Sequence, residues 1–139
     1  MKHVFLSFTG QDAQKVEHLL SLLASPEFDL GFYDGPLDMD FDAPEAELIK
    51  RAIGEKIVKC GIAVCLISEN THNCKWVDLE LAKNRNKGNR IIAMALKGTV
   101  DAVLPLIVRE ENLTFYPWDP QRLKNLIAQD SGKLFNNST

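Results

Sequence analysis

The sequence lacks the features of membrane, secreted and nucleic-acid-binding proteins. Within its 139 residues no apolar run approaches the length of a membrane span. The first residues, MKHVFLSF, do not form the signal-peptide pattern of basic start, apolar run and small-residue cleavage site. The net charge is -3, and the sequence has no basic stripe of the kind that nucleic-acid binders need. We therefore expect a cytoplasmic protein that binds neither membranes nor nucleic acid.

Potential metal ligands are also few. The three cysteines are an odd number, which argues against a disulfide framework, and their spacing matches no zinc pattern. The three histidines are scattered along the chain. Cys65 lies in an apolar run, so we expect it to be a small core residue. The sequence thus predicts no metal site.

Motifs that bind phosphate groups or activate a serine are missing as well. The segment TGQD after the first apolar run has only one glycine, which is too little for a phosphate-binding loop. No dinucleotide fingerprint is present, and no serine lies in a nucleophile elbow. A nucleotide ligand would therefore have to be held in some other way.

The sequence does contain a regular alternation of strand and helix patterns. Short apolar runs predict strands at 3–8, 28–34, 61–68 and 90–96, and a short edge strand at 113–118. Helical spacing predicts helices over 12–24, about 46–57, 75–87 and 119–129. We expect Asp12 to cap the first helix, Asp42 or Ala43 to lie near the cap of the second, and Pro44 to lie in the first turn of the second. The acidic segment 34–44 reads as a loop.

This alternation favours one fold class. Apolar strands that alternate with helices predict a parallel sheet covered on both faces. We expect a single α/β domain over residues 1–130, with a flavodoxin-like, doubly wound sheet of about five parallel strands and helices on both faces. Residues 131–139 form a polar C-terminal tail.

Ligands of such sheets bind beyond the carboxyl ends of the strands, and Glu80 lies early in a helix that starts there. At about 100° per residue, Glu80 is about 40° from Trp76 around the helix and flanks its inward stripe. Burial would raise the pKa of its carboxyl group, whereas a helix N-terminus would lower it. The sequence leaves open which effect prevails, and whether Glu80 is only a surface charge that complements the helix dipole.

Two segments resemble Toll/interleukin-1 receptor (TIR) domains. HVFLSFTGQDA is similar to their first-strand box, and GIAVCLISENTHNCKWVDLELAKNRNKGNRIIAMAL resembles their second half more closely. In the latter a Cys-x-Trp loop is followed, four residues after the tryptophan, by a glutamate. The nearest group is the compact bacterial and archaeal TIR-like proteins, including the TIR subunits of Thoeris antiphage systems.

The resemblance implies an activity and a set of site residues. Many TIR domains cleave the nicotinamide–ribose bond of NAD, which is their substrate rather than a cofactor, and make ADP-ribose-derived signals, some of them cyclic. By this resemblance Glu80 would be the catalytic residue, and no metal is required. Phe8, Thr9 and Gly10 would line the pocket, Asp34 would begin the neighbouring loop, and Trp76 would pack behind Glu80. TIR domains also self-associate, and a downstream effector would sense the product.

The chain departs from that family in its charge. Many NAD-cleaving TIR domains have basic residues after the first strand, where this chain has TGQD, and the segment 34–44 is strongly acidic. Lys75 or Lys97 could supply the missing charge. Two alternatives therefore stay open: a non-catalytic module that assembles through the acidic segment and the basic stretch 83–90, and an enzyme similar to nucleoside deoxyribosyltransferases.

Overall fold

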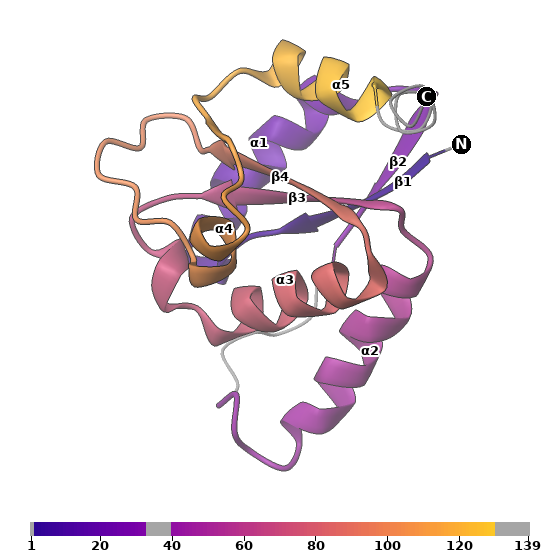
Figure 1. Cartoon of the computed structure of the whole chain (residues 1–139), viewed down its shortest axis with the longest axis vertical. Coiled ribbons are helices and arrows are strands. Elements are labelled where there is room, and N and C mark those ends of the chain that lie inside the picture. The colour runs from indigo at the N-terminus through magenta and orange to yellow at the C-terminus, as the bar shows by residue number, and fades with distance from the viewer. Residues whose placement is uncertain (1, 33–39, 130–139) are drawn as a thin grey trace.

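The computed structural model describes residues 2–32 and 40–129. The described residues form one five-stranded parallel sheet with helices on both faces, which confirms the expected fold class (Figure 1). The strands are β1 (Lys2–Ser7), β2 (Phe28–Gly31), β3 (Ile62–Ile67), β4 (Arg90–Ala95) and β5 (Phe115–Tyr116). The α-helices are α1 (Ala13–Leu23), α2 (Ala46–Val58), α3 (Lys75–Lys87), α4 (Leu106–Glu110) and α5 (Pro120–Ala128). Two short 3-10 helices are η1 (Gly10–Asp12) and η2 (Thr71–Asn73).

The order of the strands is β2-β1-β3-β4-β5, so β1 and β3 lie at the centre and the two-residue β5 lies at an edge. Every residue of β3 is buried, because helices cover both of its faces. The chain leaves β1 for an outer strand on one side and later continues from β3 to the other side. In such a sheet, the carboxyl ends of β1 and β3 flank the point where the strand order reverses and where ligands commonly bind.

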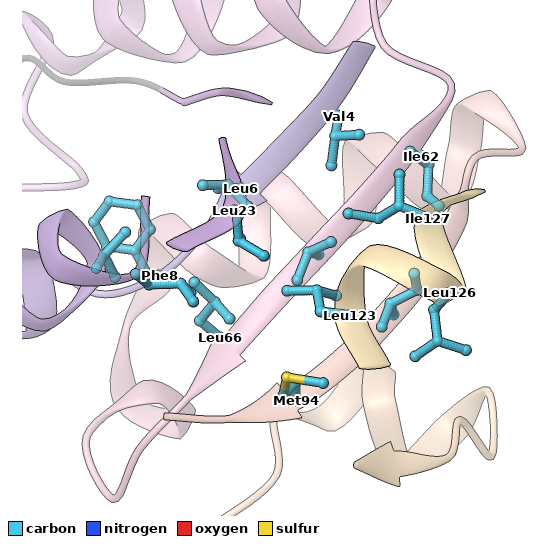
Figure 2. Packing of buried hydrophobic residues seen from close by; sticks show 14 of the residues in the cluster. Val4, Leu6, Phe8, Leu23, Ile62, Leu66, Met94, Leu123, Leu126 and Ile127 are labelled. Atoms are coloured by element: carbon cyan, nitrogen blue, oxygen red, sulfur yellow. The ribbon is translucent and has the colours of Figure 1, made fainter. Parts of the chain in front are cut away.

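Side chains of β1 alternate between two hydrophobic layers, as strand geometry requires. Val4 and Leu6 of β1, and Phe8 just after it, point to the face covered by α1 and α5 (Figure 2). Phe5 points to the opposite face, where it packs with residues of α2 and with Trp76 of α3. A third cluster fills the space between α3, α4 and the β3–β4 part of the sheet. It includes Cys65, so the expected core position of this thiol is confirmed.

One expected helix start is confirmed in position and another is wrong in detail. Asp12 is the N-cap residue of α1, as expected, but its side chain makes no capping bond, and its carboxylate accepts a hydrogen bond from Ser68. Helix α2 begins at Ala46 with Glu45 as its N-cap, so neither Asp42 nor Ala43 is the cap and Pro44 precedes the helix. The expectation for α5 is confirmed: Asp119 accepts from the backbone N–H of Arg122 at 3.0 Å.

Candidate active site

The centre of the candidate site is a buried hydrogen bond between the last residue of β1 and the middle of α3. The hydroxyl of Ser7 donates to Oε1 of Glu80 over 2.6 Å. Ser7 is fully buried, and only 3% of Glu80 is exposed. Glu80 is therefore not a solvated helix-surface charge, and the sequence-based placement of its side chain beside the inward stripe is confirmed.

Helix α3 carries two polar residues within its buried stripe, and both are hydrogen-bonded. The stripe consists of Trp76, Val77, Glu80, Leu81 and Asn84. The side-chain amide of Asn84 donates to the backbone carbonyl of Glu80 over 2.9 Å. Its oxygen accepts from the side-chain amide of Asn89, also over 2.9 Å, just past the helix end. These bonds satisfy polar groups that would be costly to bury alone, and they brace the helix turn that holds Glu80.

Burial dominates the electrostatics of Glu80 and raises the pKa of its carboxyl group from 4.5 to about 8. The hydrogen bond from Ser7 acts in the opposite direction and lowers it. Helix α3 begins at Lys75, so Glu80 lies beyond its first turn, where the field of a helix N-terminus has largely faded. Of the two opposing effects expected from the sequence, burial prevails. At neutral pH the carboxyl group is mostly protonated.

A second buried network joins the loops after β1 and β3. Ser68 donates from its hydroxyl to Oδ2 of Asp12 over 2.6 Å, and its backbone N–H donates to Oγ1 of Thr71 over 2.8 Å. All three residues are buried. The backbone N–H of Asp12 also donates to the carbonyl of Thr9 over 2.9 Å. The two loops that border the carboxyl edge of the central strands are thus fixed to each other.

Trp76 lies one turn before Glu80 in the buried stripe of α3, 5% exposed. Its ring meets that of Phe41 edge-on, with 4.8 Å between the centroids. The indole therefore closes the α2 side of the helix, and its loss would open the core beside Glu80.

The other residues expected at the site are less closely grouped. Phe8 belongs to the core cluster on the α1 and α5 face (Figure 2), with 5.5 Å between the centroids of its ring and that of Phe32. Glu80 lies instead on the α3 side of the sheet. Thr9 is buried and precedes η1, and Gly10 is exposed within η1. A side chain at Gly10 would meet no atom within 4 Å, so nothing in its surroundings requires glycine. Asp34 lies outside the described residues, as does the tail 131–139.

The candidate phosphate-binding lysines are both exposed. Lys75 forms an ion pair with Asp42 at 3.2 Å, and both side chains are more than half exposed. Such an exposed pair contributes little stability. Lys97 follows β4 at the same edge of the sheet. In the described part of the chain, no group of three histidine, cysteine or acidic side chains is placed to hold a metal ion. Nor is any helix of those residues long and apolar enough to cross a bilayer.

A cavity of about 500 Å³ lies at the opposite end of the sheet, beside Arg90 at the start of β4. It is lined by Arg85, Asn89, Arg90, Glu111 and Tyr116 among others, and by none of the residues expected at the active site. We place the candidate site at Glu80 and not at this cavity, because a buried carboxyl group with a shifted pKa at the strand switch point is the stronger indication of chemistry.

Comparison with known proteins shows the family of the chain and its fold. The family model described as Thoeris protein ThsB, TIR-like domain, matches residues 5–101, which include the end of β1 with Ser7, all of β3, and Glu80. The chain belongs to this family. The resemblance found in the sequence is thereby confirmed. No curated protein matches this TIR-like domain.

Solved structures share the fold of this TIR-like domain at low sequence identity. The TIR domain heterodimer of RPS4 and RRS1 gives 18% identity and a TM-score of 0.58, covering 94% of this chain and 95% of that chain. TIR domains of the activated Roq1 resistosome, which directly recognises the pathogen effector XopQ, give 18% identity and a TM-score of 0.60. The match covers 94% of this chain and 99% of that chain. The CMP N-glycosidase BcmB of Clostridium botulinum gives 15% identity and a TM-score of 0.56. The match covers 92% of this chain and 98% of that chain.

Sequence reasoning identified Glu80 but missed the residues that hold it. Ser7 ends an apolar run, where a serine is commonly read as the start of a turn. Its alternation with Phe5 was a usable signal that it faces α2 and α3. The bond to Glu80 spans 73 positions in the sequence, and no local pattern indicates it.

Proposed function

We propose that this TIR-like domain cleaves the bond between nicotinamide and ribose in NAD, with Glu80 as the catalytic residue. The product would be an ADP-ribose-derived signal, linear or cyclic. The observation that carries the proposal is the buried Ser7–Glu80 pair at the carboxyl edge of the two central strands, with Trp76 one turn before Glu80. Membership of a family described by a Thoeris protein supports a role in antiphage defence.

The chemistry fits a single carboxyl group in an apolar setting. Departure of nicotinamide leaves an oxocarbenium-like ribose, and a carboxylate beside it stabilises that charge or fixes the ribose hydroxyls. Burial keeps Glu80 mostly neutral in the free protein, with a pKa of about 8. The nicotinamide ring of NAD carries a positive charge, and an opposite charge nearby lowers the pKa of a carboxyl group. Substrate binding would therefore generate the carboxylate that the reaction needs.

A second candidate is cleavage of another N-glycosidic bond, in a nucleotide or nucleoside. BcmB, which shares the fold over most of both chains, is by its name a CMP N-glycosidase. The reacting bond is of the same kind, joining a ribosyl carbon to a base nitrogen, so Glu80 could serve it in the same role. The deoxyribosyltransferase-like alternative belongs to this class.

Self-association is also part of the proposal. The RPS4–RRS1 and Roq1 structures are assemblies that contain TIR domains. In this chain, Asp42 of the acidic segment pairs with Lys75, and Arg85 of the basic stretch pairs with Glu110 at 3.5 Å. Exposed pairs of this type are worth little, so they can open in favour of contacts between copies. A non-catalytic module would show this assembly without turnover.

The test is nicotinamide release from NAD at low and high protein concentration, followed by chromatography with mass analysis of the products. We expect Glu80→Gln to reduce release by about 100-fold or more, since it removes a charge that stabilises the transition state. The matched control is Glu17→Gln on the exposed surface of α1, which should leave release unchanged. Full activity of Glu80→Gln would overturn the mechanism. Turnover of CMP or a deoxynucleoside without turnover of NAD would favour the second candidate.

A further inference from the structure

We propose that Ser7 is a positioning residue for Glu80: its hydroxyl holds the carboxyl group in one orientation, with one oxygen engaged and the other left for a ligand. This inference rests on the proposed function for its activity measurement. It also makes a prediction about the titration of Glu80 that is independent of any substrate.

The bond is fixed from both sides. Ser7 is the last residue of β1, the strand between β2 and β3, so its backbone is held by the sheet. Glu80 is held through its carbonyl by Asn84 one turn later, and the side chain of Asn84 is held by Asn89. A hydroxyl with a fixed origin therefore meets a carboxyl group on a braced helix turn, over a short 2.6 Å.

The two oxygens of Glu80 differ in their partners. Oε1 receives the hydroxyl of Ser7, and within residues 2–32 and 40–129 no donor reaches Oε2. Oε2 is also not among the fully buried atoms that lack a partner in the same residues. It is therefore the oxygen that a ribosyl group would meet. Free rotation of the carboxyl group would exchange the two oxygens and blur this geometry, and a small misplacement costs catalysis heavily.

Ser7 is the only polar neighbour in the described residues that shifts the titration of Glu80. Burial raises the pKa of Glu80, and the Ser7 hydrogen bond lowers it. On the same face of the sheet, Cys65 of β3 lies beside Ser7, and the pKa of its thiol is raised by burial and then by the charge of Glu80. Burial and the Ser7 hydrogen bond are the two causes of the shift in Glu80, and no charged side chain of the described residues is among them. Removing the Ser7 hydroxyl should therefore move the pKa of Glu80 upward.

The test follows the carboxyl carbon of Glu80 by ¹³C NMR from pH 5 to 10, with the signal assigned by its absence in Glu80→Gln. We expect Ser7→Ala to titrate about one pH unit higher than the wild type, as loss of a hydrogen bond to a charged group implies. Ser7→Thr, which keeps the hydroxyl, should restore most of the shift. The matched control is Ser68→Ala, which removes an equally short and equally buried hydroxyl–carboxylate bond to Asp12 at the same edge of the sheet.

An unchanged titration in Ser7→Ala would overturn the inference, as would an equal shift in Ser68→Ala. If NAD or another N-glycoside is turned over, Ser7→Ala should also lower kcat about 10-fold with little change in KM, and move the acidic limb of the pH profile upward. Absence of turnover in the wild type would count against the proposed function alone, because the NMR titration still tests Ser7.

Discussion

Replacing Glu80 by glutamine should make the protein more resistant to alkaline pH than the wild type. The wild-type carboxyl group has a pKa of about 8 in the folded protein, against 4.5 as its ordinary value. Between these two values the folded state holds a proton that the unfolded state releases. The stability from this group is therefore fully present below about pH 4.5 and is lost as the pH rises through about 8. Glutamine does not titrate, so the variant lacks this loss.

The magnitude follows from the same two pKa values. Each unit of difference corresponds to about 1.4 kcal/mol, so the full contribution is roughly 5 kcal/mol. Between pH 6 and pH 9 the wild type should lose about 2.5 kcal/mol through Glu80 alone. For a domain of this size, 1 kcal/mol changes Tm by about 3 to 4 °C. The difference in Tm between Glu80→Gln and wild type should thus grow by roughly 8 °C over this range.

Thermal unfolding followed by circular dichroism from pH 6 to 9 would measure this difference. Subtracting the two curves at each pH cancels the titration of the other groups. Below about pH 4.5 the two proteins should be of similar stability, because the wild-type carboxyl group is then protonated in both states and the glutamine oxygen can still accept the hydroxyl of Ser7. Glu17→Gln, on an exposed position of α1, should give a flat difference. A flat difference for Glu80→Gln, within about 1 °C, would refute the claim that burial governs this carboxyl group.

Two further predictions concern the loops and the end of α3. Replacing Asp12 by asparagine or Ser68 by alanine should each lower the free energy of unfolding, measured in urea, by about 1 to 3 kcal/mol. Because the two residues share one 2.6 Å hydrogen bond, the double variant should lose less than the sum of the two single losses. Additive losses would mean that this bond is not a shared interaction. Gly88→Ala should lower the free energy of unfolding by about 1 kcal/mol in the same assay, because a φ of +88° is strained for any residue with a Cβ. The control is Gly61→Ala, where a Cβ would meet open space and the loss should be clearly smaller. Equal losses would contradict this reason.

Much of the fold could be predicted because its signals are local and repeated. Apolar runs of strand length and helical spacing indicated each main strand and helix, and their alternation indicated a parallel sheet. The errors arose where a tertiary partner overrides a local rule. Asp12 is the N-cap residue that the sequence predicts, but its carboxylate bonds to a serine 56 residues away and makes no capping bond. Helix α2 starts after Pro44 and not around it.

The candidate site shows the same division. The spacing between Trp76 and Glu80 placed the carboxyl group beside the buried stripe of α3, and the structure confirms this. Strand alternation could have shown that Phe8 does not face α3. Val4, Leu6 and Phe8 are two residues apart along the chain, so they face the same side, and all three pack in the core on the α1 and α5 face. Which serine faces Glu80 depends on how α3 crosses β1, and this arrangement of two distant elements has no signature in either segment.

The position of Glu80 also explains how the chain can keep a carboxyl group in its core. A buried carboxylate without a cation would cost several kcal/mol, but a proton removes most of that cost, and the single hydroxyl of Ser7 suffices as its partner. A lysine or arginine beside Glu80 would stabilise the protein at alkaline pH and would fix the negative charge permanently. It would also neutralise the site toward a cationic leaving group. The absence of such a partner among the described residues that shift Glu80 therefore leaves the charge of the carboxyl group to be set by what binds there.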